Sequence, residues 1–246
     1  MRIARALALG GIDSRRKCEI HVKNGAVVVN GKVVREVSLE VDPDHDVILF
    51  RGRLVEPQRY VYYILNKPEG YTTTASDPHA KKTVYELLPR NLIRGSRQPS
   101  SNRTRVFPVG RLDRDSSGLL FFTNDGELAN RLAHPKFQVK KWYEVRLNRP
   151  LEPADKSKLL AGMMLSEGVA KVEKLENLTR RIVRLLIREG KKREIRRMFE
   201  KVGYNVLHLV RISFGPIALG KLGPGHGRFL SKSEVADIKR LTKLPR

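Results

Sequence analysis

Two β-branched runs separated by an Asn-Gly pair predict a hairpin near the start of this chain. The runs occupy residues 26–29 and 32–34, and Asn30-Gly31 stands between them. Asn and Gly tolerate the positive φ angles that a two-residue hairpin turn requires. A third strand around residues 47–50 would complete a small sheet.

Two short helices are expected before this hairpin. Apolar residues recur at helical spacing from Ile3 to Leu7, and a Gly-Gly pair ends the pattern. Asp13 or Ser14 can cap a second helix over residues 15–23. We therefore expect the two helices and the hairpin to form a separate small module at the start of the chain.

The rest of the chain mixes strands with helices. Residues 51–59 contain glycine, proline and several charges, as a linker does, so we expect a small domain of residues 1–58 and a larger domain of residues 59–246. A helix with its apolar face at residues 195–202 would end at Gly203. The fold class is α+β, with a mixed sheet and helices packed on it. Apolar runs predict strands at residues 62–65, 106–109, 119–123, 142–147 and 182–187.

The charge of the chain indicates a polyanionic partner. The 49 Lys and Arg against 26 Asp and Glu leave a formal charge of +23, which attracts nucleic acid before any specific contact forms. We see no run of 18 or more apolar residues and no basic amphipathic end helix, so a membrane partner is not expected. No secretory pattern opens the chain, and we expect it in the cytoplasm.

Metal binding is not expected. Cys18 is the only cysteine, which excludes an intrachain disulfide and a multi-cysteine zinc or iron–sulfur site. The six histidines are scattered, and none stands at metal-ligand spacing from another.

Two basic segments are candidates for contacts to nucleic acid. Arg15, Arg16 and Lys17 would lie in the first turn of the second helix, where phosphate meets both charge and the helix dipole. A solvated helix face is the alternative for these three residues. Residues 91–105, rich in Arg, Ser, Asn and Pro, predict a mobile basic loop that contacts nucleic acid.

A polar turn between two predicted strands carries the most informative residues. Residues 110–118 read Gly-Arg-Leu-Asp-Arg-Asp-Ser-Ser-Gly, and flanking strands hold the side chains of such a turn firmly. Asp113 could be a nucleophile, a general base, a metal ligand or merely a turn residue. A metal-dependent hydrolase would need converging carboxylates, and only Asp115 and Asp125 lie nearby. One carboxylate that acts covalently fits better.

The same turn resembles the motif of the RsuA/RluB-type pseudouridine synthases, in which its Asp is essential. Gly-Arg-Leu-Asp at 110–113 is followed by Ser-Ser-Gly-Leu at 116–119 and by Thr-Asn-Asp-Gly-Glu-Leu-Ala at 123–129. The resemblance covers about residues 1–230. Further blocks in the family's order are Leu-Asn-Lys-Pro at 65–68, Asn-Arg-Leu-Ala-His-Pro at 130–135, Lys-Trp-Tyr-Glu-Val at 141–145 and Glu-Gly-Lys-Lys-Arg-Glu-Ile-Arg-Arg-Met-Phe at 189–199.

This resemblance extends to both domains, with two departures. Residues 2–54 are similar to the small RNA-binding domain shared by a ribosomal small-subunit protein, tyrosyl-tRNA synthetases and many pseudouridine synthases. The larger domain is then expected to hold a mixed, mainly antiparallel sheet flanked by helices. Glu194 stands where Gln is usual in these enzymes, and Trp142 stands where Thr or a smaller residue is expected.

The resemblance implies a mechanism and assigns roles. Asp113 would attack the target uridine at C6 of the base or at C1′ of the ribose, and the base would detach, rotate and rejoin through C5. Tyr143 matches the tyrosine that stacks on the uracil and helps remove the C5 proton. Arg196 matches the basic residue that pairs with the Asp and keeps it ionised. No cofactor is implied, since the reaction is an isomerisation.

Four more residues are expected around the flipped base. Arg111 would fill the space that the base leaves or hold the base out, with a phosphate contact as the alternative. Lys67 would shape the pocket edge or meet phosphate. Leu112 and Ile195 are expected to be apolar walls.

The substrate expected from the resemblance is ribosomal RNA. Residues 123–131 resemble the branch that acts on large-subunit (23S) rRNA, with small-subunit (16S) rRNA as the alternative. The partner is thus ribosomal RNA or an assembling subunit, and a monomer is expected. A non-catalytic RNA-binding or ribosome-assembly factor would leave the set of Asp113, Tyr143 and Arg196 unexplained.

Overall fold

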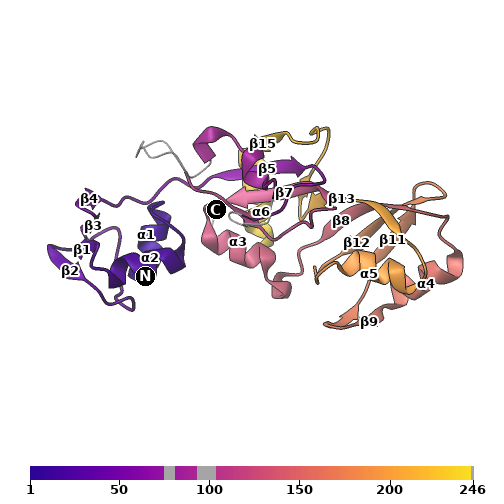
Figure 1. Ribbon diagram of the computed structural model, residues 1–246, viewed down its shortest axis with the longest axis horizontal. Helices are drawn as coiled ribbons and strands as arrows, with labels where there is room; N and C mark the ends of the chain where they lie inside the picture. Colours follow the sequence, from indigo (N-terminus) through magenta and orange to yellow (C-terminus); the bar gives the residue numbers. More distant parts are fainter. Residues whose placement is uncertain (75–80, 93–103, 245–246) are drawn as a thin grey trace. The chain divides into compact units, whose positions relative to one another are not determined.

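A computed structural model of the chain describes residues 1–74, 81–92 and 104–244. The chain divides into two compact units, one of residues 1–61 with 91–105 and one of residues 62–90 with 106–246 (Figure 1). The boundary expected from the sequence lies between residues 58 and 59 and leaves 91–105 in the larger domain. Most of the predicted basic loop lies outside the described residues.

The smaller unit is a helix–helix–hairpin module. Asn30 and Gly31 have φ angles of 49° and 81°, which confirms the predicted turn between β1 and β2. The strands follow the order β2-β1-β3-β4. Ser14 caps α2, because its side chain accepts a hydrogen bond from the backbone N–H of Lys17. Its elements are α1 (Ile3–Leu9), α2 (Arg15–Lys23), β1 (Val27–Val29), β2 (Lys32–Val34), β3 (Ile48–Phe50) and β4 (Arg53–Leu54).

A large mixed sheet organises the other unit. Its path is β11-β12-β8-β13-β7-β5-β15, with β14 beside β13 and β6 beside β7. The pair of β13 and β7 is parallel and the other pairs of this sheet are antiparallel, which confirms the mixed, mainly antiparallel sheet. The strands are β5 (Tyr62–Lys67), β6 (Phe107–Val109), β7 (Ser117–Thr123), β8 (Lys141–Leu147), β11 (Lys174–Asn177), β12 (Ile182–Ile187), β13 (Val206–Phe214), β14 (Ile217–Ala218) and β15 (Gly227–Phe229).

Helices and a separate hairpin of β9 and β10 complete this unit (Figure 1). α5 contacts β13 and β9, and α4 contacts β11. The 3₁₀ helices are η1 (Val84–Leu87), η2 (Arg90–Leu92) and η3 (Pro135–Phe137). The helices are α3 (Gly126–Ala133), α4 (Pro153–Ala161), α5 (Glu194–Lys201) and α6 (Lys232–Leu241), and the hairpin is β9 (Met163–Leu165) with β10 (Gly168–Ala170).

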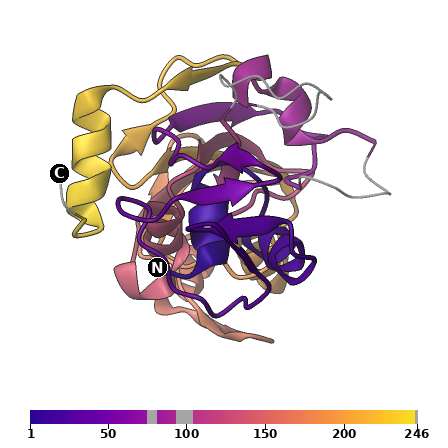
Figure 2. The ribbon, with the colours of Figure 1, turned by 90° about the vertical axis from the view of Figure 1, so that its left-hand side faces the viewer.

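One apolar core joins α3 and α6 to the sheet. Leu128 and Leu132 of α3 and Ile238 of α6 are buried in one cluster with Leu119 and Phe121 of β7. α6 is the yellow helix that leads to the C-terminus in Figure 2. These two helices therefore cover one face of the sheet behind the strand that follows the polar turn.

Glu234, in the capping box of α6, is expected to contribute to the stability of the folded protein at acid pH. Its carboxylate accepts hydrogen bonds from Arg228 over 2.7 and 2.8 Å and from the backbone N–H of Ser231 over 2.8 Å. The Arg228 guanidinium lowers the pKa of Glu234 from 4.5 to about 2.

We therefore expect Glu234→Gln to change how the unfolding free energy depends on pH in the acid range. A depressed carboxyl pKa gives stability that is present above the unfolded value of 4.5 and is lost as the pH falls toward 2. In urea titrations, the difference in unfolding free energy between native protein and Glu234→Gln should be constant above about pH 5.5 and should shrink below it. The exposed Glu200→Gln serves as the control. A difference that does not vary with pH would contradict this account.

Candidate active site

Asp113 stands in the middle of the turn between β6 and β7. The two strands pair in antiparallel register, so residues 110–116 form the loop of a hairpin. Gly110 has a φ of 71°, a left-handed conformation that favours glycine. Leu112 is buried, Asp113 is half-buried and Arg111 is exposed. The turn thus exposes part of Asp113 above a buried apolar neighbour.

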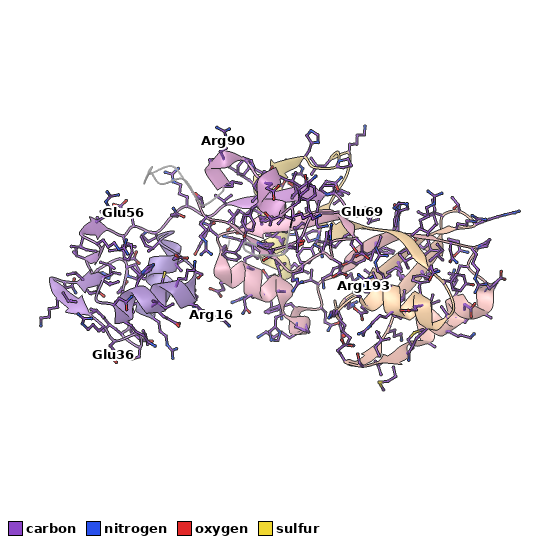
Figure 3. All side chains as sticks on the ribbon, viewed as in Figure 1. Arg16, Glu36, Glu56, Glu69, Arg90 and Arg193 are labelled. Atoms are coloured by element: carbon purple, nitrogen blue, oxygen red, sulfur yellow. The ribbon has the colours of Figure 1, made fainter. Side chains whose placement is uncertain are left out.

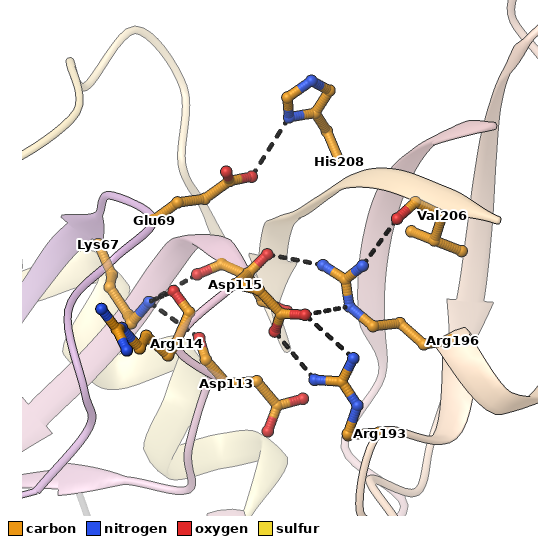
Figure 4. A network of polar contacts seen from close by, with 10 residues as sticks. Lys67, Glu69, Asp113, Arg114, Asp115, Arg193, Arg196, Val206 and His208 are labelled. Atoms are coloured by element: carbon orange, nitrogen blue, oxygen red, sulfur yellow. Dashed lines mark hydrogen bonds and ion pairs between the residues drawn. The ribbon is translucent and has the colours of Figure 1, made fainter. Parts of the chain in front are cut away.

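Lys67, the last residue of β5, is fully buried beneath this turn. Its Nζ donates to the carbonyl oxygen of Asp113 over 2.9 Å (Figure 4). It also donates to the carbonyl oxygens of Ser116 over 2.6 Å and Pro68 over 3.1 Å. Burial lowers the pKa of Lys67 to about 8. The ammonium faces carbonyls of the turn and is not exposed at the surface where a phosphate would bind. Lys67 instead holds the backbone of the turn.

Two further contacts tie the turn to the segment after β5. Thr73 is buried, and its Oγ1 donates to the carbonyl of Leu112 over 2.7 Å. The backbone N–H of Gly70 donates to the carbonyl of Arg114 over 2.7 Å. Bonded carbonyls keep a polar turn in one conformation, so its side chains are placed before any substrate arrives.

The carboxylate of Asp113 remains available. Within the part of the chain that the structure describes, it makes no hydrogen bond or ion pair, and Figure 4 draws none. Its charge still acts on a neighbour: the pKa of Arg193 is raised chiefly by hydrogen bonds to Asp115 and further by the charges of Asp115 and Asp113. A partly exposed carboxylate that no partner engages can act as a nucleophile.

Asp115, rather than Asp113, binds Arg193, the N-cap residue of α5, and Arg196 within α5 (Figure 4). Arg193 donates to both carboxylate oxygens over 3.1 and 3.0 Å, and Arg196 Nε lies 3.2 Å from Oδ2. Arg196 also donates to the carbonyls of Asp115 over 2.6 Å and Val206 over 2.8 Å. The expected pair of Arg196 with Asp113 is thus replaced, because the Val206 carbonyl anchors the guanidinium beside Asp115.

Tyr143 lies two strands away from the turn in the sheet. It is buried on β8 opposite Arg211 of β13, and Arg211 is opposite Gly118 of β7. Gly118 has a φ of 101°, and a Cβ there would stand 2.3 Å from the carbonyl oxygen of Arg211. Only glycine lets the two strands approach at this point. This register brings Tyr143 near the strand that follows Asp113.

Arg211 is a residue that the sequence interpretation missed. Its side chain is buried, its Nε donates to the carbonyl of Leu119 over 2.7 Å, and its guanidinium carbon lies 5.2 Å from the ring centroid of Phe214. Its Nη2 is buried without a hydrogen-bond partner among the residues described. The available signal was an arginine inside the apolar run of β13, where a charged side chain is seldom buried.

α5 places one expected site residue and one departure from the family pattern in the interior. Ile195 and Glu194 are both buried. Glu194 accepts a hydrogen bond from the backbone N–H of Lys191 over 3.1 Å, and burial raises its pKa. The departure from Gln therefore puts an ionisable group at the buried start of α5. Trp142, the other departure, is half-buried on β8.

The basic residues of α2 are exposed. Arg15, Arg16 and Lys17 form its first turn, and Arg16 is labelled in Figure 3. The side chain of Ser14 already accepts the backbone N–H of Lys17 over 3.4 Å. Exposure is compatible with both expected roles, a phosphate contact and a solvated helix face.

The other carboxylates near the turn have structural partners. Asp125 caps α3 by accepting the backbone N–H of Leu128 over 3.0 Å, and it accepts the hydroxyl of Tyr62 over 3.1 Å. Among the described residues, no three His, Cys, Asp or Glu side chains gather as metal ligands would. Among the same residues, no helix is long and apolar enough to cross a membrane.

Comparison with known proteins identifies both units. Residues 61–201 match the family described as RNA pseudouridylate synthase, and residues 1–48 match the S4 domain. An uncharacterised RNA pseudouridine synthase of Aquifex aeolicus is 37% identical over 243 residues, which cover 97% of this chain and 93% of the relative. The ribosomal large subunit pseudouridine synthase B of Bacillus subtilis is 37% identical over 247 residues, which cover 98% and 96%.

A solved structure agrees with these relatives. The crystal structure of a pseudouridylate synthase superposes with a TM-score of 0.67 at 28% identity, covering 97% of this chain and 99% of that chain. The matched family region includes the turn with Asp113, Tyr143 on β8 and Arg196 on α5. The chain therefore belongs to the RNA pseudouridine synthase family and begins with an S4 domain.

Proposed function

We propose that this chain converts a specific uridine of ribosomal RNA to pseudouridine, with Asp113 as the nucleophile. The observation that carries the proposal is a partly exposed, unengaged carboxylate on a turn whose backbone is held by Lys67 and Thr73. Such a group needs little reorganisation before it attacks.

The proposed reaction balances without a cofactor. Asp113 attacks C6 of the base or C1′ of the ribose, and the N1–C1′ bond breaks. The base rotates and a C5–C1′ bond forms. The bond between Asp113 and the nucleotide then breaks, C5 loses its proton and N1 gains one, so Asp113 is regenerated and substrate and product are isomers. Tyr143 is proposed to stack on the uracil and to help remove the C5 proton. Arg196 is proposed to act through Asp115, which it binds.

The uracil must leave its stack before Asp113 can reach it. Arg111 is exposed two residues before Asp113, and we assign it to the space that the base vacates, with a phosphate contact as the alternative. Leu112 and Ile195, both buried, are proposed as apolar walls.

The proposed substrate is large-subunit rRNA. The relative from Bacillus subtilis carries a large-subunit name, the S4 match covers residues 1–48, and the net charge of +23 suits a polyanion. We propose that a monomer acts in the cytoplasm, on ribosomal RNA or an assembling subunit.

Purified protein and isolated rRNAs test the substrate. The protein is incubated separately with large-subunit and small-subunit rRNA made without modifications, and pseudouridine is mapped chemically at each uridine. One new site in the large-subunit RNA is expected. A site only in the small-subunit RNA would replace the proposed substrate with its alternative, and unmodified RNA in both reactions would contradict the proposal.

The basic turn of α2 should contribute to RNA affinity through phosphate contacts. Changing Arg15, Arg16 and Lys17 together to Gln should reduce the slope of log affinity against log salt by about two, since each contact to a single strand contributes about 0.7. Filter binding between 50 and 200 mM salt measures the slope. Lys32→Gln, an exposed change on β2, is the control. An unchanged slope would assign the three residues to a solvated helix face.

A further inference from the structure

Lys141, the first residue of β8, is half-buried and binds the backbone that follows β12. Its Nζ donates to the carbonyl oxygens of Arg188 over 2.8 Å and Glu189 over 3.2 Å. Burial lowers the pKa of Lys141 to about 8, and the charge of Arg211 lowers it further, whereas the charges of Glu194 and Glu189 raise it. At pH 7 Lys141 is therefore a cation whose hydrogen bonds go to backbone carbonyls.

The two carbonyls belong to residues 188–193, which link β12 to α5 and which we call the entry segment. Arg193, the last residue of this segment, is the N-cap of α5 and has a φ of 51°. A left-handed conformation is unfavourable for a residue with a Cβ, so neighbouring contacts must hold it. Near the helix, the side chain of Glu194 accepts the backbone N–H of Lys191 over 3.1 Å. Lys141 holds the other end of the entry segment, where the chain leaves β12.

The entry segment brings α5 to the turn of residues 110–116. Arg193 donates to both carboxylate oxygens of Asp115, and Arg196, three residues later, donates to the Asp115 carbonyl over 2.6 Å (Figure 4). The turn itself is bound through its carbonyls by Lys67 of β5. Two lysines, one on β5 and one on β8, thus bind the backbones of the two segments that meet at the candidate active site.

We propose that Lys141 is a positioning residue: its ammonium holds the entry segment, and the entry segment sets where α5 meets the turn that carries Asp113. This inference rests on the proposed function of Asp113. Lys141 acts through backbone carbonyls, so it requires no contact with the uridine or with an RNA phosphate. Tyr143, two residues later on β8, lies on the same face of the strand, because side chains alternate along a strand. One strand therefore carries both the proposed stacking residue and the anchor of the entry segment.

Lys141→Met tests this role. Methionine keeps most of the apolar stem but donates no hydrogen bond, so the carbonyls of Arg188 and Glu189 lose the ammonium donor. We expect kcat for pseudouridine formation in rRNA at pH 7 to fall about 10- to 100-fold, because α5 no longer meets the turn in one fixed position. KM for the RNA should change less than about threefold, since the ammonium is bound to carbonyls rather than to phosphate.

Hydrogen exchange in the full chain measures the entry segment directly. Lys141→Met should speed exchange of the backbone amides of residues 190–197 at least about tenfold, while those of residues 119–123 in β7 keep their native rates. A general loss of stability would speed exchange in β7 as well. The contrast between the two segments therefore separates a local anchor from a residue that only stabilises the fold.

Lys140→Met is the matched control, since Lys140 is the exposed neighbour of Lys141 and carries the same charge. It should leave kcat, KM and the exchange rates unchanged. Lys141→Arg keeps a cationic donor for the two carbonyls and should keep kcat within about threefold of native. If Lys141→Met does not fold, Lys141→Gln replaces it, because the shorter amide cannot serve both carbonyls, and the same results are expected.

The outcomes separate this role from the proposed function. A kcat of Lys141→Met equal to that of Lys140→Met, or a fall in kcat without faster exchange in residues 190–197, would overturn the role of Lys141. A higher KM with an unchanged kcat would also overturn it and would assign Lys141 to RNA binding. An Asp113→Asn variant that stays active in the same assay would instead overturn the proposed nucleophile, while the exchange result for Lys141 would stand.

Discussion

Replacing Asp113 with Asn is expected to reduce the rate of pseudouridine formation at least about a thousandfold. The amide has nearly the same shape but cannot form the covalent intermediate. Lys67 and Thr73 bind the turn through its backbone carbonyls, so the substitution should leave the turn in place. Single-turnover assays with excess enzyme measure this loss directly, because they do not depend on product release.

Stability and binding distinguish a chemical role from a structural one. Asp113 is partly exposed and its carboxylate makes no hydrogen bond or ion pair in the described part of the chain, so Asp113→Asn should change the unfolding free energy by less than about 1 kcal/mol. RNA affinity should stay within a few-fold of native. Asp237→Asn, a change at a half-buried residue of α6 that pairs with Arg240, is the control for activity. A fully active Asp113→Asn protein would exclude Asp113 as the nucleophile.

Lys67→Met is expected to have the second largest effect, on both stability and rate. Methionine fills a similar volume but leaves the carbonyls of Ser116 and Pro68 without the ammonium donor. Each buried carbonyl left unpaired costs about 1–3 kcal/mol, so we expect a loss of about 2–4 kcal/mol in unfolding free energy. A loosened turn misplaces Asp113, and the rate should fall about a hundredfold.

The pH dependence of stability provides a second readout for Lys67. Burial lowers its pKa from 10.5 to about 8, so the unfolded chain binds more protons than the folded chain between these values. The unfolding free energy of native protein should therefore rise between about pH 8 and 10 relative to that of Lys67→Met. Lys232→Met, an exposed change at the first residue of α6, is the control and should change stability by less than about 0.5 kcal/mol. A stable, fully active Lys67→Met protein would show that the turn does not need this donor.

Local sequence patterns predicted the elements whose signal lies within a few residues. The Asn30-Gly31 turn, the helix capped by Ser14 and the apolar face of α5 all depend on neighbours in the chain, and the structure confirms them. The strands around Asp113 were also predicted, because their apolar runs are long and the polar turn between them is sharply bounded.

Long-range pairing could not be predicted in the same way. β13 was missed because His208 and Arg211 interrupt its apolar run, and the burial of Arg211 depends on the approach of Gly118. Arg196 lies 81 residues from Asp115 in sequence, and nothing local to either residue indicates that they meet. For the same reason, the partner of Arg196 could be inferred only from the family resemblance, which implies Asp113. α3, α4 and α6 were not assigned. α3 begins at Gly126, within the Asn-Asp-Gly run of residues 124–126 that is typical of a turn.

Mapping of pseudouridine in ribosomal RNA from cells that lack this chain tests the central claim most directly. The cells are complemented with native protein or with Asp113→Asn at equal expression. Pseudouridine is then scored at every uridine of the large-subunit and small-subunit rRNAs. We predict that one pseudouridine of large-subunit rRNA is missing without the protein, is restored by native protein and stays missing with Asp113→Asn. Restoration by Asp113→Asn, or a map that does not change when the protein is absent, would contradict the account.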